Sequence, residues 1–188
     1  MKSDNSPIPI KTARLLLRKF VTDDFSSYAA YRGRLDVYRY LYADPAKGPE
    51  LERKFKAVLE TEFHQNGDAY RLAVVRQSDK IILGDVVLKL ADKAALQAEV
   101  GYVFNPDYAG QGYATEAVGA VIDLGFRHFE FHRIFARLDT ANAASSGVVE
   151  RLGLRREAHL IENDCFNGVW RSEYIYAVLA SEWAQRIR

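Results

Sequence analysis

Two closely spaced glycines, Gly110 and Gly112, offer the clearest chemistry in this chain because they lie between an expected strand and an expected helix. A helix that begins at Tyr113 points free main-chain N–H groups and the positive end of its dipole at this turn, which suits a pyrophosphate. An ordinary structural turn explains the two glycines equally well. Two nucleotide motifs are set aside, since the chain has no Gly-Lys-Ser/Thr and Thr115 stands where a dinucleotide fingerprint needs Gly or Ala.

A second polar stretch, 139–153, places Asn142 at the end of an expected strand and Ser145 near the first turn of an expected helix. Either side chain can bind a ligand. Both are also residue types that cap helices by hydrogen bonding to the main chain. Taken alone, this stretch favours capping.

The elements that carry these stretches follow from the period of the apolar residues. Strands are expected over 14–20, 70–76, 81–90, 97–104, 132–139, 154–161 and 173–179, and helices from 22, over 35–42 and 51–63, from 113, and over 145–152. The sequence of strand, glycine turn, helix and strand forms a crossover unit, which places one parallel pair in a mostly antiparallel sheet. We therefore predict an α/β fold of the α+β type, with a mixed central sheet of about seven strands.

Composition narrows the class of protein. The chain has 188 residues, of which 48% are apolar, and 26 basic residues balance 25 acidic ones to a net charge of +1. This predicts one soluble domain over 8–186 after a flexible tail, 1–7, without the basic clusters of a nucleic-acid-binding protein. No apolar run approaches the ~18 residues of a membrane span, and the single cysteine fits a reducing compartment, so a cytoplasmic protein is expected.

Metal and thiol chemistry are not expected. The four histidines, His64, His128, His132 and His159, share no spacing typical of a metal site. Cys165 lies beside an Asn-Gly turn with nothing nearby to lower its pKa, so no cysteine nucleophile is predicted.

Five blocks of sequence occur together and in order. They are Thr12-Ala-Arg-Leu-Leu-Leu-Arg18, Gly84-Asp-Val, Gly110-Gln-Gly-Tyr-Ala-Thr-Glu-Ala117, Asn142-x-x-Ser145 with Glu150-Arg-Leu-Gly153, and Tyr176-Ala-Val-Leu-Ala-Ser-Glu-Trp183. As a set they resemble the GNAT superfamily of N-acetyltransferases, and within it the ribosomal-protein N-terminal acetyltransferases of the RimJ/RimL type. The resemblance covers nearly the whole chain and implies the GNAT fold, with helices on both faces of the sheet.

The resemblance implies acetyl-CoA as the cofactor, used as a co-substrate. The superfamily's pyrophosphate loop, Gln/Arg-x-x-Gly-x-Gly/Ala, falls on 109–114, where Ala109 replaces Gln or Arg and leaves the main-chain donors in place. The pantetheine arm is expected to run between two diverging strands, and a main-chain N–H near Phe104 can face the thioester oxygen. The residues expected to bind acetyl-CoA are Val103, Phe104, Gly110, Gln111, Gly112, Tyr113, Ala114 and Asn142.

The implied reaction is direct attack of a neutral primary amine on the thioester in a ternary complex. It needs a base for the amine, donors for the thioester oxygen and a proton for the leaving thiolate. By the resemblance, Ser145 is the candidate acid, and Asp164 or Glu99 is the candidate base. Tyr174 or Tyr176 can serve as the acid instead. Helix capping, core packing and plain surface exposure remain the structural alternatives for these residues.

The expected acceptor is the α-amine of a protein N-terminus. An α-amine with a pKa near 8 is partly neutral at pH 7, whereas a lysine near 10.4 costs about 3 units, or roughly 4 kcal/mol. Two alternatives remain open, a small amine (antibiotic, polyamine or amino acid) and a CoA-binding sensor that has lost catalysis. A monomer or homodimer is expected, with no nucleic-acid or membrane partner.

Overall fold

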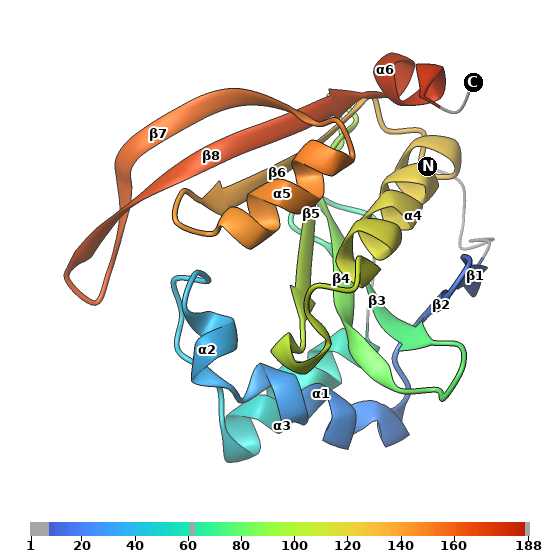
Figure 1. Ribbon diagram of the computed structural model, residues 1–188, viewed down its shortest axis with the longest axis vertical. Helices are drawn as coiled ribbons and strands as arrows, with labels where there is room; N and C mark the ends of the chain where they lie inside the picture. Colours follow the sequence, from blue (N-terminus) through green and yellow to red (C-terminus); the bar gives the residue numbers. More distant parts are fainter. Residues whose placement is uncertain (1–7, 61–62, 187–188) are drawn as a thin grey trace.

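The computed structural model describes residues 8–60 and 63–186, and its centre is one sheet of eight strands in the order β1-β2-β3-β4-β5-β6-β8-β7 (Figure 1). All neighbouring strands are antiparallel except β5 and β6, which are parallel. The strands are β1 (Ile10–Lys11), β2 (Leu15–Arg18), β3 (Ala69–Arg76), β4 (Ile82–Asp92), β5 (Gln97–Phe104), β6 (Arg133–Asp139), β7 (Arg155–Phe166) and β8 (Val169–Leu179). The predicted α/β fold with a mixed, mostly antiparallel sheet is confirmed. The tail predicted over 1–7 lies outside the described residues.

Helices cover both faces of this sheet, as predicted. They are η1 (Thr22–Asp24), α1 (Phe25–Arg32), α2 (Leu35–Tyr38), α3 (Gly48–Leu59), η2 (Pro106–Tyr108), α4 (Tyr113–Arg127), α5 (Ala143–Arg151) and α6 (Ala180–Gln185). Successive side chains of a strand point to opposite faces. Accordingly, Leu72 and Val74 of β3 belong to the core under α4 and α5, whereas Ala73 and Val75 belong to the core under α1 and α3.

Besides the unpredicted helices η2 and α6 and an α2 shorter than expected, three differences from the prediction concern the sheet and what packs on it. The eighth strand is β1, a two-residue strand in which Ile10 pairs with Leu17. The helix expected to reach residue 63 ends at Leu59, and Phe63 packs on the opposite side of the sheet with Tyr70 and Phe129.

The third difference is the hairpin of β7 and β8, which is longer than expected. Residues 162–172 lie outside the predicted strands, but the pairing continues to Phe166 and Val169. It closes through Asn167 and Gly168, both with positive φ, the conformation of a tight hairpin turn. In Figure 1 this hairpin extends beyond the rest of the sheet.

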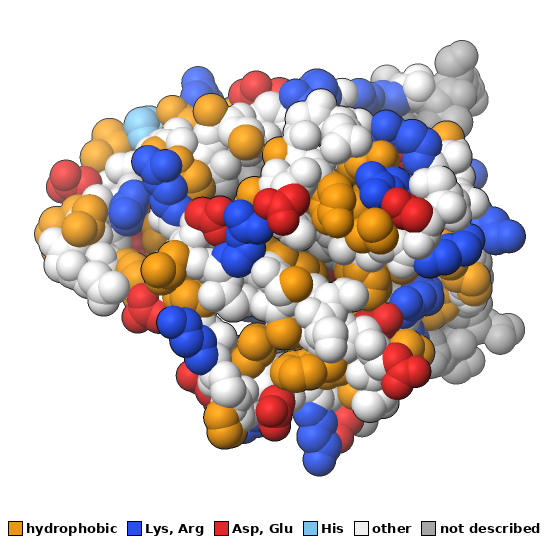
Figure 2. Space-filling view, turned by 60° about the horizontal axis from the view of Figure 1, so that its bottom comes forward, with side chains coloured by type: hydrophobic (Ala, Val, Ile, Leu, Met, Phe, Trp, Pro, Cys, Tyr) orange, Lys and Arg blue, Asp and Glu red, His pale blue; other side chains and the backbone are white. Residues whose placement is uncertain are grey.

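The surface carries mixed charge. On the face shown in Figure 2, Lys and Arg side chains are interspersed with Asp and Glu, and no single basic patch covers this face. In the described part of the chain, no helix is long and apolar enough to cross a membrane.

Candidate active site

A cavity of about 1130 Å³ opens beside the parallel pair of strands. Its wall comes from β5, the loop 105–112, the first turns of α4 and α5, the end of β6, the α2 region and the β7–β8 hairpin. All the site residues expected from the sequence line it: Glu99, Val103, Phe104, Gly110, Gln111, Gly112, Tyr113, Ala114, Asn142, Ser145 and Asp164. The fold therefore brings them to one place.

The cavity exists because β5 and β6 diverge. Their described ladder holds three parallel pairs and ends at Glu99 and Phe135. Beyond that point each strand follows its other neighbour, β5 pairing with β4 as far as Phe104 and β6 with β8 as far as Asp139. The edge of β5 that faces the gap can receive an extended ligand as if it were a further strand.

The glycine-turn end of the cavity, residues 105–115, has the geometry of an anion site. Gly110 and Gly112 have φ of 77° and 79°, a conformation that residues with a side chain rarely adopt. A Cβ on Gly110 would meet nothing within 4 Å, so the space beside this residue is open. The first helical bond of α4 runs from the Glu116 N–H to the Gly112 carbonyl, 3.1 Å away. The amides of the preceding first turn therefore have no partner within the helix and are available to an anion.

Arg14 and Glu116 brace this turn, a contact that the sequence did not predict. The Arg14 guanidinium donates to the Gln111 carbonyl at 2.9 Å and to the Glu116 carboxylate at 2.7 Å, and it lies over the Tyr113 ring. Burial would raise the pKa of Glu116, but hydrogen bonds from Thr12 and Arg14 hold it below its ordinary value. The start of β2 thus fixes the start of α4.

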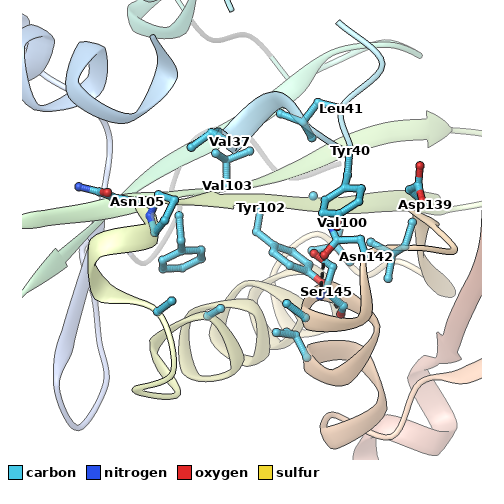
Figure 3. A pocket seen from close by; sticks show the side chains of 18 of the residues that line it. Val37, Tyr40, Leu41, Val100, Tyr102, Val103, Asn105, Asp139, Asn142 and Ser145 are labelled. Carbon is cyan, nitrogen blue, oxygen red and sulfur yellow. Dashed lines mark hydrogen bonds between the residues drawn. The ribbon is translucent and has the colours of Figure 1, made fainter. Parts of the chain in front are cut away.

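Asn142 and Ser145 lie opposite the turn, on the first turn of α5 (Figure 3). Asn142 Oδ1 accepts from the Ser145 N–H at 3.1 Å, so the capping interaction is present. Its side-chain NH₂ remains as a donor beside the cavity. The Ser145 carbonyl accepts from the Tyr102 hydroxyl at 2.8 Å, which ties α5 to β5 across the gap.

The hairpin end of the cavity, defined by Tyr42, Glu99, Arg137, Asp139, Asp164 and Glu173, carries most of its carboxylates. Glu99 accepts from the Arg137 guanidinium at 3.1 Å, and this bond is the main reason that the pKa of Arg137 is raised. Glu173 and Asp164 contribute to the same rise, so they lie near the same arginine. Glu99 and Asp164 are thus brought together on this wall.

A buried ion cluster lies on β4 beside the end of β5, where Asp85 is the register partner of Val103. The Asp85 side chain of β4 is fully buried and accepts from the Tyr31 hydroxyl at 2.7 Å, from Arg32 at 2.6 Å and from Arg71. Burial alone would raise the pKa of Asp85, but the charges and hydrogen bonds of the two arginines hold it below its ordinary value. Arg32 and Arg71 also line the cavity, so this cluster connects α1 to its wall.

The other side chains considered from the sequence lie elsewhere. Tyr174 and Tyr176 are not among the described residues that line the cavity. Tyr176 belongs to the core, and its hydroxyl donates to the exposed Glu150 at 2.7 Å. Cys165 is exposed. Within residues 8–60 and 63–186, no group of three or more His, Cys, Asp or Glu side chains is placed to hold a metal ion.

Comparison with known proteins gives consistent matches over most of the chain. Residues 14–155 match the family model described as "Acetyltransferase (GNAT) domain". The chain is 32% identical to "Uncharacterized N-acetyltransferase YnaD" of Bacillus subtilis over 93% of its length and 98% of the relative's. It is 28% identical to the B. subtilis protein named "Putative ribosomal N-acetyltransferase YdaF" over 56% of this chain and 57% of that one.

Solved structures agree. The acetyltransferase (GNAT family) from Bacillus anthracis superposes with a TM-score of 0.84 at 29% identity, covering 92% of this chain and 99% of that one. Spermidine N-acetyltransferase from Vibrio cholerae, solved in complex with CoA and spermine, gives a TM-score of 0.79 at 22% identity, covering 92% and 99%.

Proposed function

Because this chain belongs to the GNAT family of acetyl-CoA-dependent acyltransferases, we propose that it acetylates the α-amine of a protein N-terminus by direct attack in a ternary complex. The observation that carries the proposal is one continuous cavity, with main-chain donors at the glycine-turn end and carboxylates at the hairpin end. These are the groups that a phosphorylated donor and a cationic acceptor require. A cytoplasmic location and a monomeric or homodimeric state are part of the same proposal.

The residues present fit acetyl-CoA. A Cβ on Gly110 would meet nothing within 4 Å, and the first-turn amides of α4 have no partner within the helix, so 110–114 would hold the pyrophosphate. Ala109 supplies no side-chain donor, but Arg14 at Gly112 and Arg151 at Thr115 bring positive charge to this end. The free edge of β5 at Val103 and Phe104, together with the Asn142 amide, would hold the pantetheine arm. Acetyl-CoA supplies an acetyl group activated as a thioester.

The remaining roles fall to side chains beside the gap. A main-chain N–H near Phe104 would donate to the thioester oxygen, and the Ser145 hydroxyl would protonate the leaving sulfur. Ser145→Ala keeps the main-chain groups that bond Asn142 and Tyr102, so it isolates the hydroxyl. The expected result is a kcat at least about tenfold lower at unchanged KM for acetyl-CoA. An unchanged kcat removes Ser145 from the mechanism.

Glu99 and Asp164 compete for the role of base. Glu99 is held by Arg137, whereas Asp164 lies on the exposed hairpin. Because an α-amine is already partly neutral at pH 7, either carboxylate can act as the base that removes its proton. Glu99→Gln and Asp164→Asn, compared over a pH–rate profile, assign the role: the variant of the true base loses the acidic limb of kcat/KM.

A small cationic amine is the second candidate acceptor. The observation that favours it is the set of carboxylates at the hairpin end, and the V. cholerae relative described above acts on spermidine. The two acceptors are separated by measuring CoA release with a serine-starting peptide, the same peptide with an acetylated N-terminus, and spermidine. Release with the free peptide but not the blocked one supports the α-amine, and release with spermidine alone supports the small amine.

The same assay tests catalysis itself. If CoA binds in a calorimeter but none of these amines accelerates CoA release, the chain is a CoA-binding sensor and the proposed activity is wrong.

A further inference from the structure

Gly84 of β4 packs against the end of β5 more closely than a side chain allows. It is the register partner of Phe104, and a Cβ on Gly84 would lie 2.7 Å from the Phe104 Cα and closer still to the Val103 carbonyl oxygen. Real Cβ atoms almost never come within 3.0 Å of another atom. Alanine at this position must therefore push the main chain of Val103 and Phe104 away from β4.

This contact lies inside a continuous ladder, next to a bulge in β4. On the β3 side, Val74 pairs with Gly84 and Val75 pairs with Ile82, so Leu83 is an extra residue in β4. A bulge of this kind bends the strand locally. On the β5 side, the Leu83 carbonyl accepts from the Asn105 N–H at 2.8 Å. The two strands therefore stay bonded beyond Gly84, and the close approach is not a frayed end.

The same ladder fixes the direction of the Phe104 N–H. Residues along an antiparallel strand direct their main-chain groups alternately toward one neighbour and away from it. Because the Asn105 N–H bonds the Leu83 carbonyl of β4, the Phe104 N–H points to the opposite edge of β5. The described pairing of that edge with β6 ends at Glu99, so at Phe104 the edge faces the gap. The Phe104 N–H is thus a main-chain donor directed at the cavity that Phe104 lines.

The peptide bond between Val103 and Phe104 connects these observations. It is trans, and the C=O and N–H of a planar trans peptide point in opposite directions. The Val103 carbonyl oxygen is the atom nearest the position of a Gly84 Cβ, so it faces β4 and the N–H of the same peptide faces the gap. In Figure 3, Val103 and Tyr102 point to opposite sides of β5, as they do in an extended strand. Any displacement of the carbonyl therefore displaces the N–H.

We propose that Gly84 is a positioning residue, whose lack of a side chain sets the Phe104 N–H where the thioester oxygen binds. This inference rests on the proposed function, in which that N–H donates to the oxygen, and it adds the residue that directs the donor. Gly84 is not among the described residues that line the cavity, so it acts through Phe104. Such a donor is effective at about 2.7–3.1 Å from the developing negative charge, so a shift of several tenths of an ångström weakens it.

Three variants test this role. Gly84→Ala adds one methyl group against the main chain of β5 and leaves the glycine turn unchanged. Phe104→Pro removes the donor itself, and it removes no bond of the β4–β5 ladder because that N–H points away from β4. Gly125→Ala is the matched control. A Cβ on Gly125 would lie 2.6 Å from the end of the Ile134 side chain, but Gly125 is in α4, outside the described cavity lining.

The first measurement is steady-state release of CoA with an amine that the wild-type protein accepts. Gly84→Ala should lower kcat at least about tenfold and leave the KM for acetyl-CoA within about twofold, because the turn proposed to hold the pyrophosphate is intact. Gly125→Ala should keep both values, whatever its stability. A Gly84 that served packing alone would lower the free energy of unfolding and leave the kcat of the folded protein unchanged.

The second measurement needs no acceptor amine. Infrared difference spectra of bound acetyl-CoA, labelled with carbon-13 at the carbonyl, report the hydrogen bond to the thioester oxygen, because this bond lowers the carbonyl stretching frequency. We expect the frequency to fall on binding to wild type and to Gly125→Ala. Most of this shift should be lost in Gly84→Ala, and all of it in Phe104→Pro.

The outcomes separate this inference from the proposed function. If Gly84→Ala keeps the wild-type kcat and carbonyl frequency while Phe104→Pro loses both, the donor stands and the role of Gly84 is overturned. If no amine releases CoA but the carbonyl shift depends on Gly84, the inference stands and the acetyltransferase activity is wrong.

Wild-type protein decides if Gly84→Ala does not fold. Amide hydrogen exchange should then show the Phe104 N–H exposed in the free protein and protected by acetyl-CoA but not by CoA. An N–H that is already protected in the free protein, or that acetyl-CoA leaves unprotected, overturns the inference.

Discussion

The glycine-turn end and the hairpin end of the cavity are built from different parts of the chain. At the glycine-turn end, one continuous stretch from the end of β5 into α4 supplies the wall, and the groups on offer are main-chain amides. At the hairpin end, side chains arrive from the α2 region, β5, β6, β7 and β8. One end depends on local backbone geometry and the other on tertiary packing.

This difference has a consequence for specificity. Main-chain amides present the same donors whatever side chains surround them, so the glycine-turn end tolerates surface changes as long as its φ angles are kept. The hairpin end presents carboxylates and a hydroxyl, and each of these changes with a single substitution. Donor binding is therefore set by the backbone, and acceptor choice by side chains that can vary independently.

The largest expected effect is on the buried ion cluster around Asp85, beside the end of β5. Asp85→Ala leaves Arg32, with 11% of its side chain exposed, and Arg71 without their shared carboxylate. Breaking a buried pair in this way costs about 3–5 kcal/mol in the free energy of unfolding. Urea unfolding measures it, and Glu50→Ala, which removes an exposed ion pair with Lys54, should cost less than about 0.5 kcal/mol.

The pH dependence of the same variant has a definite sign. Because the folded-state pKa of Asp85 lies below its ordinary value, its stabilisation is complete above the unfolded pKa of about 3.9 and is lost as the pH falls toward the folded pKa. The difference in unfolding free energy between wild type and Asp85→Ala should therefore be constant from pH 7 to 5 and shrink below about pH 4. A difference that shrinks already near pH 6 contradicts this assignment.

The next effect separates the two ends directly. Gly112→Val forces a β-branched residue to a φ of 79° at the turn whose main-chain amides would bind the pyrophosphate. This conformation costs about 1–3 kcal/mol in backbone strain, which the chain relieves by losing the turn. Because the turn would hold CoA, we expect the Kd for CoA to rise about 10- to 100-fold. Calorimetry with CoA measures it, while amine binding at the hairpin end should be retained.

Gly67→Val is the matched control for that strain. Gly67 also has a positive φ, 95°, and open space around its Cβ position, but it lies in the turn before β3, away from the cavity. It should lose stability without losing affinity for CoA. Equal CoA binding by folded Gly112→Val and wild-type protein would remove the glycine turn from the donor site.

The glycine-turn end could be predicted from the sequence because its geometry is local. Gly110, Gly112 and the start of α4 lie within a few residues of each other, and glycine at a positive φ is a property of the residue itself. The Asn142 cap was readable for the same reason. The contact of Arg14 with Gln111 was not, because it joins β2 to the α4 turn through the fold.

Most of the hairpin end could not be predicted from the sequence. β7 is exposed along most of its length, so its residues show no apolar period. Residues 162–166 therefore lie outside the predicted strands, although Asp164, Cys165 and Phe166 pair with β8. Asp139 was placed at the end of a strand, but nothing in the sequence links it to Tyr42 or Arg171. Asp85, one carboxylate in an apolar strand, is a signal of a buried partner that does not identify Arg32 or Arg71.

A smaller effect tests whether Asn142 caps α5, binds acetyl-CoA, or does both. Asn142→Ala should lower the free energy of unfolding by about 1 kcal/mol, because the Ser145 N–H loses its cap. Asn142→Asp keeps the cap but replaces the side-chain NH₂ with an acceptor. It should retain stability and raise the KM for acetyl-CoA about three- to tenfold. Unchanged KM in both variants would leave Asn142 with capping alone.

The smallest effect concerns the hydrogen bond from Tyr102 that joins β5 to α5. Tyr102→Phe removes the donor to the Ser145 carbonyl, a bond of 2.8 Å, and should cost about 0.5–1.5 kcal/mol of unfolding free energy. Burial raises the pKa of Tyr102, so its hydroxyl remains a donor at neutral pH and the cost should not vary between pH 6 and 8. Since α5 carries both Asn142 and Ser145, loss of this bond should also lower kcat a few-fold. A loss of stability with unchanged kcat would show that the cap alone holds α5 in register with β5.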